Sequence, residues 1–133
     1  MNLRVVPELY CSNVTLSASF FIDVLGFQVE YERPEEGFYY LNRDGVSLML
    51  EGIMPSNRQW FTGKLEVPFG RGINFEWEVK DLDILYQNVK ALAPEAIYLS
   101  LESRVYITAD KQVMQDQFIV QVPDGYLFRF CQG

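Results

Sequence analysis

Four glutamates are the residues of this chain whose positions could support chemistry. Glu8 and Glu51 fall in two segments typical of β-strands, and Glu76 and Glu78 fall in a third. Because successive strand residues point to opposite faces, Glu76 and Glu78 share one face, and Asn74 shares it with them. The chain contains no histidine. A metal ion bound here would therefore depend on oxygen ligands, which Mg²⁺, Mn²⁺ and Ca²⁺ accept.

The same alternation places Glu8 on the face of Val6 and Glu51 on the face of Met49. Three interpretations of the four carboxylates stay open. They could form an oxygen-only metal site, they could line a groove for a cationic ligand, or they could be solvated charges, some of them paired with Arg129. Carboxylates gathered in a dry cavity would have raised pKa values.

Covalent catalysis has no support in the sequence. No histidine is present to activate a serine or cysteine, and neither Cys11 nor Cys131 has a positive neighbour that clearly lowers its pKa. Residues 70–72 are too short for a glycine-rich phosphate loop and open a strand. Residues 123–126 (PDGY) predict a tight turn in which glycine supplies the positive φ.

Aromatic side chains are a second candidate binding group. Trp60 lies in a segment without periodicity, where a tryptophan has little reason to be unless something covers it. We expect Trp60 and Phe38 to stack on a flat ligand, a contact worth about 0.5–1.5 kcal/mol beyond the area it buries. Phe38 shares its strand face with Tyr40, and Tyr39 shares the other with Leu41. The sequence alone does not decide which pair faces a ligand.

The elements that position these residues occur twice. In the first half we expect a helix over residues 15–24, capped by Ser12 or Asn13 and ended by Gly26. The apolar stripe expected on this helix consists of Leu16, Phe20, Phe21 and Val24. The expected strands of this half are 5–10, 28–33, 38–41 and 46–51.

The second half repeats the pattern, with a helix over residues 82–92 after a cap-like Asp81, and with Trp77 in the core. The expected strands are 73–79, 96–101, 104–108, 117–122 and 126–131, with a turn region at 109–115. Such a repeat predicts two copies of one supersecondary unit packed face to face, with a ligand groove between them.

Composition limits the possible partners. The chain has 133 residues, 49% hydrophobic and 15% aromatic, which is enough for one compact unit with a sizeable core. Its formal net charge of -7 disfavours nucleic acid and modestly favours a cationic ligand, although acidity also simply aids solubility. No apolar run predicts an export signal or a membrane span, so we expect a soluble cytoplasmic protein in which Cys11 and Cys131 are buried thiols.

Five segments together carry a family resemblance over essentially the whole chain. The chain resembles the vicinal oxygen chelate superfamily, in particular the bleomycin-resistance-like branch of the glyoxalase/bleomycin resistance protein/dioxygenase family. The segments are VPELYCSN (6–13), FFIDVLGF (20–27), GVSLMLEG (45–52), RGINFEWEV (71–79) and VPDGYLFRF (122–130).

The resemblance implies an α+β fold in which two tandem βαβββ modules form a shared cavity, usually in a homodimer. It implies one domain over residues 1–133, with a first module at about 1–52, a linker at about 53–72 that could act as a flap, and a second module at about 73–133. Metal-dependent members of the superfamily hold their ion with four side chains. The matching positions here are Val6, Met49, Asn74 and Arg129, none of which is a good ligand.

We therefore predict a non-catalytic protein, without metal or cofactor, that sequesters a cationic aromatic compound such as a bleomycin-type antibiotic and so confers antibiotic resistance. The alternatives are a divalent-metal-dependent lyase, isomerase or dioxygenase with carboxylate-only ligands, and a protein-interaction module. The predicted ligand-binding residues are Glu8, Phe38, Met49, Glu51, Trp60, Asn74, Glu76, Glu78 and Arg129.

Overall fold

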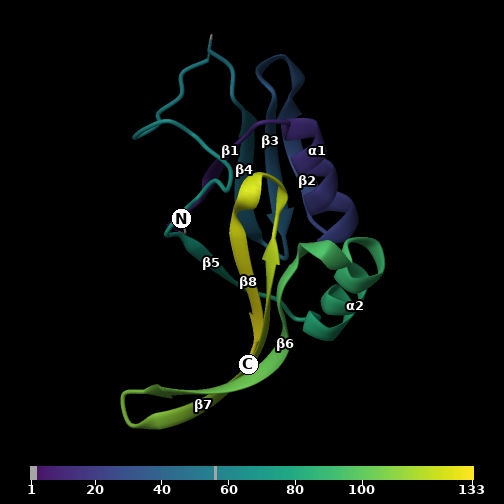
Figure 1. The fold of residues 1–133 in the computed structure, drawn as a ribbon, viewed down its shortest axis with the longest axis vertical. Coiled ribbons are helices and arrows are strands. Elements are labelled where there is room, and N and C mark those ends of the chain that lie inside the picture. The colour runs from purple at the N-terminus through teal and green to yellow at the C-terminus, as the bar shows by residue number, and fades with distance from the viewer. Residues whose placement is uncertain (1–2, 56) are drawn as a thin grey trace. The chain divides into compact units, whose positions relative to one another are not determined.

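The computed structural model describes residues 3–55 and 57–133; Met1, Asn2 and Ser56, the last within the expected linker, lie outside the described residues. The chain divides into two compact units, Met1–Glu66 and Val67–Gly133. Each unit is a four-stranded sheet with one main helix on one face (Figure 1).

The strands of the first unit follow the order β1-β4-β3-β2, in which β1 and β4 are parallel and the other neighbours are antiparallel. Buried apolar side chains, among them Leu9, Phe21, Leu41, Leu48 and Leu50, fill its core. Its elements are β1 (Glu8–Cys11), α1 (Val14–Ser19), a π-helical turn (Phe20–Val24), β2 (Gln28–Arg33), a 3-10 turn (Pro34–Glu36), β3 (Phe38–Arg43) and β4 (Val46–Gly52).

Local sequence explains where α1 begins and where its π-helical extension ends. The side chain of Asn13 accepts a hydrogen bond from the Leu16 amide at 3.1 Å, which confirms one of the two expected caps. Gly26 has a φ of 78°, which a residue without Cβ adopts at little cost. The buried Arg43 then donates from Nε to the Leu25 carbonyl at 2.8 Å and satisfies one of the orphan acceptors of the helix end.

The second unit repeats this topology, with strand order β5-β8-β7-β6 and a parallel β5–β8 pair. The predicted repeat of a βαβββ unit is thereby confirmed. Its elements are β5 (Asn74–Glu78), α2 (Leu82–Leu92), a 3-10 turn (Pro94–Ala96), β6 (Ile97–Thr108), β7 (Lys111–Gln121), a 3-10 turn (Pro123–Gly125) and β8 (Leu127–Gln132).

The core of the second unit lies between α2 and its sheet. The Tyr86 ring on α2 contacts Phe118 edge-on, with 4.9 Å between ring centroids, so Phe118 marks the helix side of the sheet. Trp77 is buried, as predicted. At the start of α2, the Leu82 amide donates to the Gln132 side chain at 3.2 Å, and the Asp81 side chain does not cap the helix.

The β6–β7 hairpin corrects the expected boundaries. Residues 96–101 and 104–108 were expected as two strands before a turn region at 109–115, but β6 is one strand from Ile97 to Thr108 and the turn is confined to residues 109–110. Residues 111–115 are part of β7, because they pair with β6 from Lys111 opposite Thr108 to Gln115 opposite Arg104.

Two smaller expectations were wrong. The first strand was expected from Val5 but begins at Glu8, and Val5 is exposed. Leu16 was expected on the buried stripe of the first helix but is 58% exposed, whereas Phe21 and Val24 of that stripe are buried, as are Ala18 and Leu25.

Two further sequence predictions concern the cysteines and the lengths of the helices. Cys11 and Cys131 are buried thiols, as predicted. Among the residues that the structure describes, no helix is long and apolar enough to span a membrane.

Candidate functional site

Strand pairing assigns the faces of the first sheet. Val14 of α1 lies within 3.4 Å of the point where a Gly52 side chain would begin, so Gly52, Leu50 and Leu48 face α1. Phe38 pairs with Glu51 and Tyr40 pairs with Met49, which puts these four side chains on the opposite face. Phe38 and Tyr40, and not Tyr39 and Leu41, are therefore the pair that lies on the face away from α1.

The face of the first sheet away from α1 carries an aromatic stack. The Tyr31 ring lies 5.0 Å from Tyr40 and 5.9 Å from Phe38, with interplanar angles of 15° and 28°. The Arg33 guanidinium lies 4.0 Å above the Phe38 ring. Phe38 is therefore only 3% exposed, whereas Tyr31 is 46% exposed.

Tyr31 was missed by the sequence reasoning. Its strand, β2, was expected correctly, but its ring reaches Phe38 and Tyr40 only because β2 and β3 pair with a register shift between Val29 and Tyr31. A tyrosine in the strand next to an aromatic strand is the signal that could have drawn attention to it.

The two carboxylates of the first unit have defined partners. Glu51 is 7% exposed, and its Oε2 accepts a hydrogen bond from the Gln59 side chain at 3.0 Å. Glu8 is exposed and accepts from the Tyr10 hydroxyl at 3.2 Å. Burial raises the pKa of Tyr10, and the negative charges of Glu8 and Glu51 raise this pKa further, while the hydrogen bond from the Trp60 amide lowers it.

Trp60 is held by its backbone while its side chain stays exposed. Its amide donates to the Tyr10 hydroxyl at 3.1 Å, and the next residue, Phe61, packs edge-on against the Tyr10 ring at 4.8 Å. The Trp60 side chain is 68% exposed, with the Arg58 guanidinium 5.5 Å from its ring centroid. An indole fixed in this way is available to stack on a ligand.

The second sheet presents a charged row on the face away from α2. Arg129 lies opposite Glu76 in the parallel β5–β8 pair and donates to its carboxylate at 2.8 Å. The exposed Asn74 and Glu78 lie on the same strand face as Glu76. The salt bridge with Arg129 was one of the interpretations that the sequence left open.

Gln117 is a buried polar residue that the sequence reasoning missed. It is 4% exposed, and its Oε1 accepts hydrogen bonds from Arg129 and Tyr106 at 3.2 and 3.1 Å. Its Nε2 donates to the Glu102 carboxylate at 2.8 Å. The Gln117 amide thus fixes the guanidinium of Arg129 and links three strands of the second sheet, because Gln117 lies on β7, Arg129 on β8, and both Tyr106 and Glu102 on β6.

Cys131 lies beside this charged row. Burial raises the pKa of its thiol, and the negative charges of Glu76 and Glu78 add to the rise against the opposing effect of Arg129. A buried thiol with a raised pKa is a poor nucleophile.

The predicted site residues form two groups, one in each unit. The first unit holds Glu8, Phe38, Met49 and Glu51 on one sheet face, with Trp60 in the segment that follows β4. The second unit holds Asn74, Glu76, Glu78 and Arg129 on one sheet face.

The donor set does not fit a divalent metal. Val6 precedes β1 and has no donor atom, Met49 offers only a thioether, and Arg129 is a fixed cation. Within residues 3–55 and 57–133, no three His, Cys, Asp or Glu side chains come together as metal ligands.

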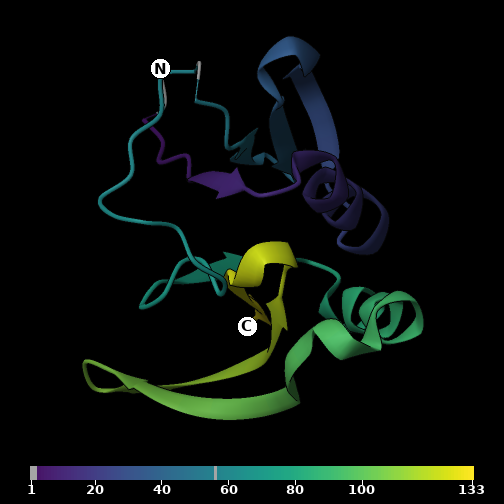
Figure 2. The ribbon, with the colours of Figure 1, turned by 45° about the horizontal axis from the view of Figure 1, so that its top comes forward.

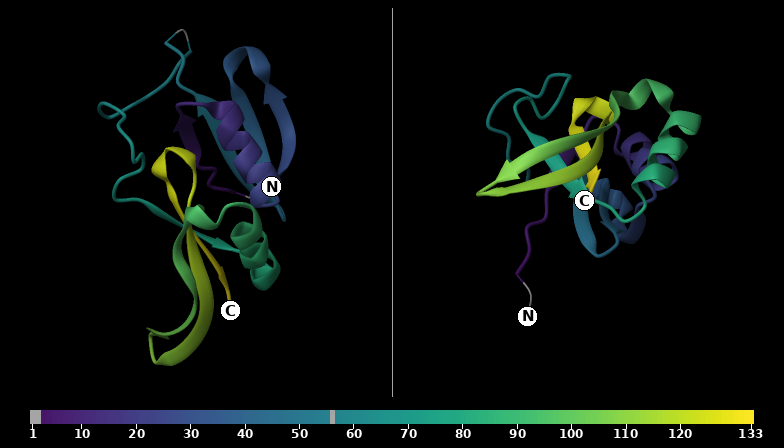
Figure 3. Two further views of the ribbon diagram at one scale, coloured as in Figure 1. Left: turned by 45° about the vertical axis from the view of Figure 1, so that its right-hand side comes forward. Right: turned by 90° about the horizontal axis from the view of Figure 1, so that it is seen from below.

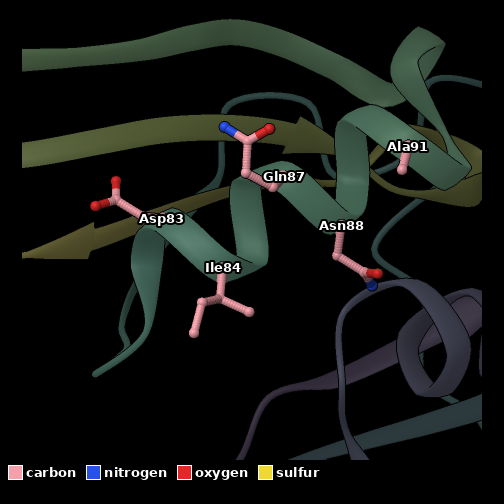
Figure 4. Close-up of a pocket in the computed structure, with 5 residues that line it drawn as sticks. All are labelled: Asp83, Ile84, Gln87, Asn88 and Ala91. Atoms are coloured by element: carbon pink, nitrogen blue, oxygen red, sulfur yellow. The ribbon is translucent and has the colours of Figure 1, made fainter.

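A surface pocket of about 450 Å³ lies elsewhere, along α2, and none of the predicted site residues lines it (Figure 4). All its lining residues project from that helix, and they are Asp83, Ile84, Gln87, Asn88 and Ala91.

Comparison with known proteins identifies the family. A scan of protein-family models gives no match, and a search of curated proteins gives none either. Among solved structures, a glyoxalase/bleomycin resistance protein/dioxygenase superfamily member from Vibrio splendidus 12B01 is 55% identical, with 99% of this chain and 100% of that one covered and a TM-score of 0.47.

Two more distant structures share the fold. TioX from Micromonospora sp. ML1 is 18% identical, with 98% of each chain covered and a TM-score of 0.75. The bleomycin-binding protein from bleomycin-producing Streptomyces verticillus, complexed with copper(II)-bleomycin, is 19% identical. The match covers 100% of this chain and 98% of that one, with a TM-score of 0.59. On the strength of the 55% identical relative, this chain belongs to the glyoxalase/bleomycin resistance protein/dioxygenase superfamily.

Proposed function

We propose that this protein binds a small cationic aromatic molecule without transforming it, and that a bleomycin-type antibiotic is a candidate ligand. The observation that carries the proposal is Trp60, whose amide is bound to Tyr10 while its indole is 68% exposed. A flat cationic ligand stacked on this indole would gain both aromatic and cation–π attraction. The shared fold of the Streptomyces verticillus bleomycin-binding protein supports the choice of ligand.

Charge supports the cationic character of the ligand. Glu8 and Glu51 lie on the aromatic face of the first sheet, and the chain as a whole carries a formal charge of -7. On the second sheet, Glu78 and Asn74 offer polar groups, whereas the charges of Glu76 and Arg129 largely compensate each other. We propose that the first group supplies the stacking contacts and the negative charge for the ligand.

We also propose that the protein does not catalyse a reaction of its ligand. No histidine is present to ligate a metal or act as a base, and the Cys131 thiol has a raised pKa. Sequestration needs only binding, so the lack of histidine and of a reactive thiol would not impair it. We propose that the protein acts as a homodimer in the cytoplasm, where thiols such as Cys11 and Cys131 stay reduced.

Calorimetric titration of the chelator-treated protein with metal-free bleomycin tests the ligand. We expect saturable binding near one ligand per chain that weakens as salt is added, because salt screens the carboxylates. Trp60→Ala should weaken binding about tenfold, equivalent to about 1.4 kcal/mol, whereas Trp60→Phe should restore most of it. Tyr98→Ala, which removes another exposed aromatic ring, serves as the matched control and should bind like the wild type.

Two outcomes would contradict the proposal. The first is the absence of both heat and thermal shift at millimolar bleomycin. The second is binding that Trp60→Ala and Tyr98→Ala weaken equally, since the exposed indole would then have no special part in it.

A further inference from the structure

Part of the β6–β7 hairpin pairs with no other strand of its sheet. β8 pairs with β7 only from Asp116 onward, so residues 104–108 and 111–115 pair with each other alone. We call these ten residues the hairpin arm. Figures 1, 2 and 3 show the arm extending beyond β5 and β8. A two-stranded ribbon of this kind buries little apolar surface by itself.

The arm nevertheless exposes large apolar side chains. Val105, Ile107 and Met114 are 52%, 74% and 62% exposed, and the pairing of Val105 with Met114 puts all three on one face. Val113, on the other face, is 41% exposed. Exposed apolar side chains gathered on a projecting ribbon indicate an interaction surface rather than a solvated one.

The outer edge of the arm is open to another strand. β6 is the last strand in the order of its sheet, so within residues 3–55 and 57–133 no strand pairs with its outer N–H and C=O groups. The first part of β6 is protected by register shifts between Ile97 and Leu99 and between Leu99 and Glu102. From Glu102 to Thr108 the pairing with β7 is unbroken, and this stretch contains neither proline nor glycine.

We propose that this edge binds the same edge of a second copy of the chain. Two β6 strands would pair antiparallel about a two-fold axis normal to the sheet, which places one residue opposite its own copy at the centre. The two sheets would then form one continuous eight-stranded sheet. The apolar faces of both arms would lie on the same side of it.

Among the three registers centred on Arg104, Val105 and Tyr106, the charges of the arm favour one. With Arg104 at the centre, two guanidinium groups would face each other, and with Tyr106 at the centre Glu102 would face Asp110. With Val105 at the centre, Arg104 faces Tyr106, Glu102 faces Thr108 and the two Val105 side chains meet. This register has no like-charged pair and adds an Arg–Tyr contact on each side of the axis.

This inference rests on the proposed homodimer and is independent of ligand binding. Sedimentation equilibrium across a hundredfold range of concentration tests it. We expect a mass near twice the 15.5 kDa chain for the wild type, and an at least tenfold weaker association for Ile107→Lys. Ile84→Lys is the matched control, since Ile84 on α2 is 71% exposed against 74% for Ile107. Far-UV circular dichroism should show that both variants keep the fold.

Cross-linking tests the register. Under mild oxidation, Val105→Cys should form a disulfide-linked dimer, whereas Ile107→Cys should not, because its expected neighbour is Ser103 of the other copy. The wild type should give no cross-link, because Cys11 and Cys131 are buried.

A monomeric wild type would overturn the homodimer and this inference together. A wild-type dimer that Ile107→Lys leaves intact would overturn the arm interface alone. A dimer in which Val105→Cys fails to cross-link would overturn the register proposed here.

Discussion

The hydroxyl oxygen of Tyr10 accepts a hydrogen bond from the Trp60 amide at 3.1 Å and so joins β1 to a segment fifty residues later in the chain. The same hydroxyl donates to the Glu8 carboxylate at 3.2 Å. Tyr10 therefore uses its one donor and one acceptor direction to connect a proposed charged group with a proposed stacking group. Neither contact is visible as a sequence motif.

Tyr10→Phe should release Trp60 without disturbing the core. The variant keeps the ring that packs on Phe61 and removes only the hydroxyl, so we expect a loss of about 1 kcal/mol in unfolding free energy. Hydrogen exchange of the Trp60 amide should become faster, and bleomycin binding should weaken severalfold. Tyr98→Phe, at another exposed tyrosine, is the control. Unchanged exchange at Trp60 would show that the hydroxyl does not hold this segment.

The raised pKa of Tyr10 predicts a pH dependence of stability. Burial is the largest cause, so the folded state binds the phenolic proton more tightly than the unfolded chain does. The resulting contribution to stability is complete below the ordinary tyrosine pKa of about 10, and it is lost as the pH rises through the folded-state pKa. Urea unfolding between pH 9 and 11 should show the stability advantage of the wild type over Tyr10→Phe shrinking with pH. A constant difference would contradict this.

Gly125→Ala should destabilise the second unit by at least about 2 kcal/mol. Gly125 has a φ of 114°, and a Cβ there would lie 2.4 Å from the Pro68 side chain. Gly45→Ala is the control that has the backbone strain of a positive φ without a steric clash. Gly45 has a φ of 87°, and no described atom lies within 4 Å of the Cβ that alanine would add. We expect the smaller loss of about 1 kcal/mol for Gly45→Ala in urea denaturation. Equal losses would mean that contact with Pro68 is unimportant.

Arg43→Met should cost about 2 kcal/mol of unfolding free energy. The Arg43 side chain is 8% exposed, and the variant would remove its charge-assisted bond to the Leu25 carbonyl. Lys64→Met is the control, because Lys64 is 85% exposed and its salt bridge with Glu66 should contribute less than about 0.5 kcal/mol. Chemical denaturation measures both. Similar values for the two variants would contradict a stabilising role for Arg43.

Much of the fold follows from local patterns in the sequence. Residues 28–33 alternate as a strand, Asp44–Gly45 closes a hairpin, and Asn13 and Gly26 bound the first helical segment. These signals depend on residues close together in the chain, so they can be recognised without the rest of the molecule. The boundaries of the β6–β7 hairpin were predicted incorrectly because they do not depend on local signals alone. Residues 111–115 become a strand only through their pairing with residues 104–108.

The contacts of the candidate site residues depend more on tertiary structure than the fold does. The alternation of Glu76 and Trp77 was enough to predict that one is exposed and the other buried. The partners of the candidate residues could not be predicted, because each contact joins segments far apart in the sequence. Gln59 contacts Glu51, and Gln117 contacts Arg129, through side chains that no local pattern distinguishes.

By itself, the sequence determined that this protein repeats one βαβββ pattern and that no imidazole can take part in its chemistry. Only the tertiary structure decided that Phe38 is covered, that the rings of Tyr31 and Trp60 are exposed, and that Arg129 is held between Glu76 and Gln117. The physical reason is that strand alternation is a property of neighbouring residues, whereas exposure and partnership are set by the register in which distant strands pair.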